Sequence, residues 1–294
     1  IDSMKGALLG PEYNQEEIEN SLLKCGAKFE VLDDDSIIKT TAKALVEGKA
    51  VGWFQGRMEF GPRALGARSI IADPRSEKMQ KTLNLKVKYR ESFRPFAPSI
   101  LREDLNEWFD FDYDSPYMLL VCDVKKNIRY ELNEAEKKLF GIDKLNIKRS
   151  KIPAVTHIDY SARVQTVHRD TNPKYHSLIS RFKEITGCPL LVNTSFNVRG
   201  EPIVCTRTDA FKCFMGTQLD VLVVGNCFLT KVDQKIELIE KNGLEIESFF
   251  IELLPKNFVE VSEENFLTIK KLVDFLENLE DVQNVYSNYR VEKN

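Results

Sequence analysis

Two short stretches of this 294-residue chain concentrate side chains that could bind anions. The first, RMEFGPRALGARS at 57–69, places Arg57, Arg63 and Arg68 among two glycines and a proline. The second, NTSFNVRGEPI at 193–203, gathers amides, hydroxyls and one more arginine. Guanidinium groups and open backbone N–H groups can both reach phosphate oxygens. Neither stretch matches a Walker loop or a dinucleotide-binding fingerprint. Together they indicate an enzyme that handles a nucleotide and a second small anion.

The bulk composition excludes several classes of function. The net charge of −3 and the pI near 5.9 argue against bulk attraction to nucleic acid or to a membrane surface, although a local basic pocket stays compatible with them. No apolar run approaches the roughly 20 residues that span a bilayer, and no signal peptide is visible. The six cysteines show no CxxC spacing, so we interpret them as reduced, buried thiols of a cytoplasmic protein.

Sequence periodicity predicts alternating helices and strands up to about residue 230, which is typical of an α/β fold with a mixed sheet. We expect Asp35 to cap a helix over 36–48, and Pro74 to open a second helix over 74–88. The other expected elements are strands at 50–56, 97–101, 161–167, 188–193 and 220–230, and helices at 174–186, ended by Gly187, and at 208–216. Residues 1–34, with a short helix near 15–24, read as a linker or the edge of a missing domain. The charged segment 125–153 reads as an insertion that could act as a lid.

The pattern of the last 60 residues predicts a small separate domain. Their order is a helix over 231–242, strands near 246–253 and 258–261, a helix capped by Ser262, and a closing strand in VQNVYSNY. This α-β-β-α-β order is that of most of a ferredoxin-like unit. We therefore expect a main domain over 35–232 and a small α/β tail over 233–294.

Four motifs resemble, in the same order, the carbamoyltransferase family of NodU and TobZ. They are GRMEFGPRALGARSIIADPR, VKYRESFRPFAPSIL, ARVQTVHRDTNP and PLLVNTSFNVRGEPIVCT. The resemblance covers about 40–230 and implies a YrdC-like domain with a mixed twisted sheet and flanking helices. It implies that this domain makes carbamoyl-adenylate from carbamoyl phosphate and ATP, with Mg²⁺. An N-terminal actin-like domain, missing from this chain, would hold a metal and carbamoylate the hydroxyl of a small molecule.

The resemblance also implies roles for individual residues. It assigns the catalytic positions to Lys88, Arg63, Arg163 and Ser195, and nucleotide binding to Arg94, Asn197, Arg90, Thr194 and Arg68. Several fixed cations would lower the barrier by positioning and charge neutralisation, without a protein nucleophile. Structural ion pairs with nearby glutamates are the alternative role for Arg57, Arg68 and Arg90. The three histidines show no metal-binding spacing, so we assign no metal ligands in this chain and expect surface or structural roles for them.

The tail resembles a different family. KNGLEIESFFIELLPKNFVEVSEENF and DVQNVYSNY are similar to the C-terminal end of YebC-type proteins, which are linked to transcription regulation and translation. A natural fusion, an accident of gene assembly and a coincidental similarity are all open, and the simplest role is a packing or dimerisation module. The tail has an acidic excess, so nucleic-acid binding is not expected of it.

Two other functions compete with carbamoyl-adenylate formation. One is a related RNA-modification chemistry, that of the threonylcarbamoyl-adenylate synthases. The other is a non-catalytic regulatory module in which the tail supplies the function. The GPRALG and FRPFAP motifs favour the carbamoyltransferase.

Overall fold

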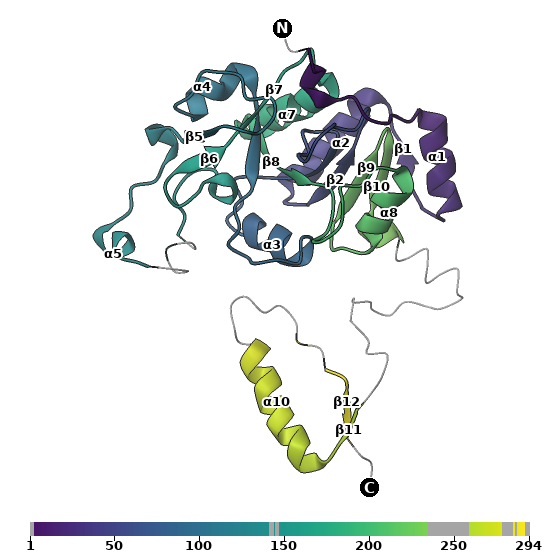
Figure 1. Cartoon of the computed structure of the whole chain (residues 1–294), viewed down its shortest axis with the longest axis vertical. Coiled ribbons are helices and arrows are strands. Elements are labelled where there is room, and N and C mark those ends of the chain that lie inside the picture. Colours follow the sequence, from purple (N-terminus) through teal and green to yellow (C-terminus); the bar gives the residue numbers. More distant parts are fainter. Residues whose placement is uncertain are drawn as a thin grey trace. The chain divides into compact units, whose positions relative to one another are not determined.

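The computed structural model describes residues 3–140, 144, 147–234, 259–277, 285 and 287–291 (Figure 1). The chain divides into two compact units, Ile1–Asn242 and Gly243–Asn294. The domain boundaries that we placed after residues 34 and 232 stay predictions. Among the described helices, none combines the length and apolarity that a membrane crossing requires.

Within the described part of the first unit, eight strands form one mixed sheet in the order β1-β10-β9-β2-β3-β8-β4-β7. Most neighbours are antiparallel, whereas β2 with β9 and β4 with β7 are parallel. The strands are β1 (Glu30–Val31), β2 (Val51–Phe54), β3 (Arg68–Ala72), β4 (Ala97–Leu101), β7 (Gln165–Val167), β8 (Leu190–Ser195), β9 (Val221–Val224) and β10 (Cys227–Thr230). A separate antiparallel pair consists of β5 (Val121–Asp123) and β6 (Ser161–Arg163).

Helices flank this sheet, and the predicted α/β class with a mixed sheet is confirmed. The longer helices of the unit are α1 (Gln15–Lys24), α2 (Asp34–Val46), α3 (Met79–Lys86), α7 (Pro173–Thr186) and α8 (Arg207–Met215). Helices α2 and α7 pack on each other and contact the sheet, and α1 packs on α8 (Figure 1). Short helices include α4 (Leu105–Trp108) and α5 (Glu134–Lys137). Thus the segment before residue 35 contributes a helix and an edge strand to this unit.

Four local predictions need correction. The cap of α2 is Asp33 rather than Asp35, because its side chain accepts a hydrogen bond from the Ser36 N–H. Helix α3 starts at Met79 and not at Pro74, since the intervening residues form turns. The segment 161–167 is two strands in different sheets, and 220–230 is a hairpin that turns at Gly225 with a φ of 56°.

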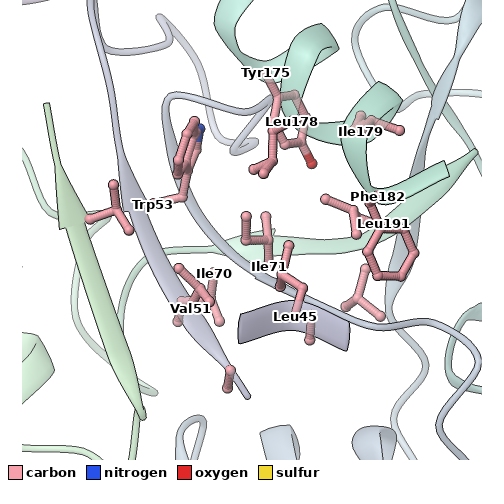
Figure 2. Close-up of a cluster of buried hydrophobic side chains, with 14 of the residues drawn as sticks. Leu45, Val51, Trp53, Ile70, Ile71, Tyr175, Leu178, Ile179, Phe182 and Leu191 are labelled. Atoms are coloured by element: carbon pink, nitrogen blue, oxygen red, sulfur yellow. The ribbon is translucent and has the colours of Figure 1, made fainter. Parts of the chain in front are cut away.

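The core on one face of the sheet lies between α7 and the central strands. Figure 2 shows Tyr175, Leu178, Ile179 and Phe182 of α7 pointing toward side chains of β2, β3 and β8. Asn172 caps the helix by accepting from the Tyr175 N–H, Pro173 is its first residue, and Gly187 ends it with a φ of 73°. These local signals explain why α7 matches its prediction closely.

Gly66 allows the arginine loop to pass close to this core. Its φ is +103°, and a Cβ added there would lie 2.2 Å from Cδ1 of the buried Tyr175. We expect Gly66→Ala to lower the free energy of unfolding by about 3–5 kcal/mol, because backbone strain and overpacking add. The measurement is urea denaturation of the purified chain.

Gly61 supplies the matched control for this prediction. Its φ is +131°, and no atom lies within 4 Å of an added Cβ. Gly61→Ala should therefore cost only the backbone strain, about 1–2 kcal/mol. Equal losses in the two variants would contradict the role that we give to the contact with Tyr175.

The second unit contains a βαβ element. Strand β11 (Val259–Val261) pairs in parallel with β12 (Tyr289–Val291), and α10 (Glu263–Glu277) connects them. Ser262 caps α10 by accepting from the Asn265 N–H, as predicted. The closing strand lies at the end of the predicted VQNVYSNY segment and beyond it. Of the predicted helix over 231–242 only 231–234 are described, and they are helical; the predicted strand over 246–253 lies outside the described residues.

Candidate active site

Strand pairing brings the sequence motifs together at one end of the sheet. Strand β8 lies between β3 and β4 and is antiparallel to both. The last residues of β8 therefore lie beside the first residues of its two neighbours, with Ser195 opposite Ser69 and Asn193 opposite Ala97. The arginine loop precedes β3, the FRPFAP motif precedes β4, and NTSFN ends β8. Segments that are about 100 residues apart in sequence thus converge.

A pocket of about 450 Å³ lies where these segments meet. Four arginines from three segments line it, and residues of β8 complete the same wall. The lining includes Arg63, Arg90, Arg94, Arg163, His157, Asn193, Thr194 and Ser195. No aspartate or glutamate is among the lining residues, and in the part of the chain that the structure describes Arg63, Arg94 and Arg163 form no ion pair. The pocket is therefore an uncompensated cationic site, which suits an anionic ligand with several oxygens.

The positive charges of the arginines in this pocket repel one another. Burial lowers the pKa of Arg163, and the nearby positive charge of Arg63 lowers it further. Burial and the charge of Arg94 lower the pKa of Arg90 to about 10. With a pKa of about 10, the Arg90 guanidinium still holds its proton at neutral pH. A bound phosphate would relieve this repulsion, which favours the binding of anions.

A buried carboxylate shapes the arginine loop. Oε1 of Glu59 accepts hydrogen bonds from the N–H groups of Leu65, Ala67 and Arg68, at 2.7, 2.7 and 3.1 Å. These bonds close the loop around Gly61–Ala64 and leave the Arg63 side chain exposed at the pocket. Glu59 is one of the glutamates near Arg57 and Arg68 that the sequence offers as ion-pair partners. Glu59 instead holds the backbone of the arginine loop. No signal in the sequence distinguishes a glutamate with this role from one that forms an ion pair.

Asn84 plays a similar part for the basic loop that follows α3. Its buried amide nitrogen donates to the carbonyls of Ser92 and Arg94, and its Oδ1 accepts from Nε of Arg90 at 2.6 Å. The Arg90 guanidinium also lies over the ring of Phe96, 5.0 Å from its centroid. Arg90 therefore lines the pocket in a fixed orientation. The sequence analysis did not single out Asn84.

Lys88 lies beneath the pocket and not on its wall. Its side chain is 3% exposed, and Nζ donates to the carbonyl of Ser195, to Oγ of Ser195 at 3.2 Å, and to Asn197 O and Oδ1 at 3.0 and 2.7 Å. The Ser195 hydroxyl itself donates to Asn197 Oδ1 at 2.7 Å. One ammonium group thus holds the whole Ser-Phe-Asn turn. Burial, and next the charge of Arg90, lower the pKa of Lys88 to about 7.

Arg68 does not lie at the pocket, which corrects its predicted place among the nucleotide ligands. The side chain is fully buried, and its guanidinium donates to the carbonyls of Gln55, Ala67, Pro11 and Gly56. It also lies over the ring of Phe54, 3.5 Å from the centroid. Arg68 therefore has a structural role, which was the alternative to nucleotide binding. It binds backbone carbonyls, however, and not the glutamate that this alternative predicted.

Asn197 touches the site through Ser195 and Lys88, and is not among the lining residues of the pocket. Arg57 lies outside the pocket as well, and pairs with Glu12 at 3.3 Å on the surface. In contrast, His157 does line the pocket, although we had expected a surface or structural role for it. Within the described residues, no group of three or more His, Cys, Asp or Glu is arranged to hold a metal ion.

Comparison with known proteins shows the family of this chain. The family model described as the carbamoyltransferase C-terminus matches residues 42–231, which is well over half of the chain. The chain belongs to the carbamoyltransferase family. All the carbamoyltransferase motifs at the pocket, from the arginine loop to NTSFN, lie within the matched range.

Several known proteins are similar to this chain in sequence. An uncharacterised protein of Synechocystis sp. is 55% identical, covering 79% of this chain and 38% of its own length. Nodulation protein NolNO of Sinorhizobium fredii is 41% identical, with coverage of 76% and 30%. The 3'-hydroxymethylcephem-O-carbamoyltransferase of Streptomyces clavuligerus is 36% identical, with coverage of 65% and 32%. The chain therefore spans only about a third of the length of these three relatives.

Two further similarities are weaker or local. A crystal structure of full-length HypF in its phosphate- and nucleotide-bound form aligns with 65% of this chain and 25% of its own, at 20% identity and a TM-score of 0.38. At this distance the likeness adds nothing to the carbamoyltransferase assignment. The family model described as TACO1/YebC second and third domain matches residues 217–289, in line with the resemblance noted for the tail.

Proposed function

We propose that this carbamoyltransferase domain binds carbamoyl phosphate and ATP and forms carbamoyl-adenylate. The observation that supports this most is the convergence of Arg63, Arg90, Arg94 and Arg163 on one pocket without a lining carboxylate. Water would first release inorganic phosphate from carbamoyl phosphate. The carbamate oxygen would then attack the α-phosphorus of ATP, and pyrophosphate would leave. Each step gathers negative charge at the reacting centre.

The arginines would position both substrates and neutralise the charge that builds up as pyrophosphate leaves. A cation about 4 Å from a phosphate oxygen contributes roughly 4 kcal/mol at an effective dielectric of 20, before desolvation. The hydroxyls of Thr194 and Ser195 would orient the ligand from the end of β8. Magnesium would enter with the ATP phosphates, as it usually does when it binds through substrate phosphates.

The acceptor of the carbamoyl group would be a hydroxyl of a small molecule. The Streptomyces clavuligerus relative is named as a carbamoyltransferase of a hydroxymethyl group, and this chain covers 32% of it. We therefore propose that a further domain, like the additional length of the relatives, binds the acceptor and completes the transfer. The reactive adenylate would then have to pass between domains shielded from water.

The test is ATP–pyrophosphate exchange by the purified chain with magnesium. We expect radioactive pyrophosphate to enter ATP when carbamoyl phosphate is present, and not when it is omitted. Exchange that depends on L-threonine and bicarbonate instead would favour a threonylcarbamoyl-adenylate synthase. If ATP and carbamoyl phosphate both fail to raise the melting temperature, the pocket does not bind them and the proposal is wrong.

A further inference from the structure

The pocket contains one side chain whose chemistry differs from that of the arginines. A guanidinium group can only donate hydrogen bonds, whereas a neutral imidazole has one donor and one acceptor nitrogen. His157 lies half-buried on the pocket wall, and its Nδ1 is 3.1 Å from Oγ of Ser161. Which nitrogen carries the proton therefore decides whether His157 offers the pocket a donor or an acceptor.

The neighbouring residues settle the position of this proton. Oδ1 of Asp159 is 3.0 Å from the Ser161 N–H and 2.7 Å from Ser161 Oγ. These hydrogen bonds from Ser161 lower the pKa of Asp159, so its carboxylate is ionised and can only accept. The single hydroxyl hydrogen of Ser161 then points to Asp159. Ser161 Oγ must accept from the other side, and this places the imidazole proton on Nδ1 of His157.

The consequence is a bare Nε2 on the same ring. Burial lowers the pKa of His157, the charges of Arg163 and Arg149 lower it further, and only Asp159 opposes them. The ring is therefore neutral at pH 7. Among the described residues, Nε2 has no hydrogen-bond partner, and the ring faces a pocket whose other charged groups are donors.

A second acceptor on the pocket wall is less accessible. Oδ1 of Asn193 also has no partner, but this atom is sealed from solvent, and the Asn193 amide nitrogen is fixed by Ala64 O, Ser99 Oγ and Gln165 Oε1. The Thr194 hydroxyl can act as a donor, so it does not require a donor on the ligand. The Ser195 hydroxyl already donates to Asn197 Oδ1 and accepts from Nζ of Lys88. His157 is thus an accessible group of this pocket wall. Because its ring is neutral and protonated on Nδ1, its Nε2 can only accept a hydrogen bond.

We propose that Nε2 of His157 accepts a hydrogen bond from the carbamoyl NH₂ group and so selects carbamoyl phosphate over acyl phosphates. This inference rests on the proposed function. Carbamoyl phosphate carries acceptor oxygens that match the arginines, and its amide is its one strong donor. Acetyl phosphate has a similar size and phosphate group but a methyl in place of that amide. When acetyl phosphate binds, Nε2 of His157 would be left without a hydrogen-bond partner. A site built to hydrogen-bond a polar group discriminates strongly against an analogue that lacks this group.

The experiment measures the affinities of carbamoyl phosphate and acetyl phosphate by calorimetry for the unmodified chain and for His157→Phe. We expect the unmodified chain to bind carbamoyl phosphate at least about tenfold more tightly, as one buried hydrogen bond allows. Phenylalanine keeps a planar ring and removes Nε2. The preference should therefore fall close to one, while the affinity for acetyl phosphate changes by less than about twofold because the arginines are intact.

Three results would overturn the inference. If His157→Phe keeps the preference for carbamoyl phosphate over acetyl phosphate, Nε2 does not recognise the carbamoyl group, and the proposed function is unaffected. An equal loss of both affinities would assign His157 to phosphate binding or to folding. If the unmodified chain binds neither phosphate, the proposed function fails together with this inference.

The tautomer can be tested without a variant. The chain has three histidines, so long-range ¹H–¹⁵N NMR spectra resolve them readily. One ring should show the Nδ1-protonated neutral form at pH 7, and Ser161→Ala should shift that ring toward a mixture of tautomers and lower the carbamoyl preference by about half. A spectrum in which His157 is protonated on Nε2 would overturn the inference even if His157→Phe fails to fold.

Discussion

Arg163→Ala should weaken the binding of carbamoyl phosphate by between about tenfold and a hundredfold. Arg163 ends β6 at the pocket, half-buried beside Arg63, and forms no ion pair among the described residues. Its hydrogen-bonding capacity is therefore available to a ligand. A hydrogen bond to a charged group contributes about 1.5–3 kcal/mol, which gives the expected range. Calorimetric titration of the purified variant is the measurement.

The stability of Arg163→Ala should hardly change, since the half-buried arginine repels Arg63 and lacks a carboxylate partner in the described structure. Arg181→Ala is the matched control. It removes the same charge from α7, where Arg181 pairs with Glu184 at 2.6 Å and is not among the residues that line the pocket. If both variants bind carbamoyl phosphate equally well, Arg163 does not contact the ligand.

Lys88→Met should abolish most of the response to carbamoyl phosphate, with a loss of at least about tenfold in affinity. The Lys88 ammonium holds two carbonyls and two side-chain oxygens of the turn from Ser195 to Asn197. Without it, these acceptors lose their common donor and the turn is free to change shape. Lys86→Met, two residues earlier at the end of α3, is the control of equal charge.

The same variant tests the protonation of Lys88. An unfolded lysine holds its proton up to about pH 10.4, whereas burial lowers the pKa of folded Lys88 to about 7. Between these values the unfolded state binds more protons, so the contribution of Lys88 to stability rises with pH. We expect the difference in free energy of unfolding between the unmodified chain and Lys88→Met to shift in favour of the unmodified chain from pH 7 to pH 9.

Urea denaturation at pH 6, 7, 8 and 9 measures this difference, and other titrating groups cancel between the two proteins. A difference that does not vary with pH would show that the four oxygen contacts keep Lys88 protonated in the folded chain. Because a buried charge costs free energy, Lys88→Met should remain folded at every pH tested.

Elements with strong local signals were predictable from the sequence. The α7 helix has a capping Asn172, Pro173 at its start and Gly187 at its end, and each acts through the backbone of its own turn. Strand β4 coincides with its predicted range over 97–101. The predictions that failed depended on competition between equivalent signals, as at Asp33 and Asp35, or on a turn inside an apolar run, as at Gly225.

The sequence by itself determined the family, the α/β class and the set of motifs from which the pocket is made. Only the tertiary structure decided which members of that set reach the pocket. Arg63 and Arg68 lie five residues apart in one loop, yet one is exposed at the pocket and the other is buried against carbonyls. The difference arises because Arg68 begins β3, and pairing with β2 and β8 directs its side chain into the interior. The proton on His157 likewise depends on the contacts that Asp159 and Ser161 make in the fold. Residue types and spacing record local backbone preferences, whereas burial and proton position follow from strand pairing over long sequence separations.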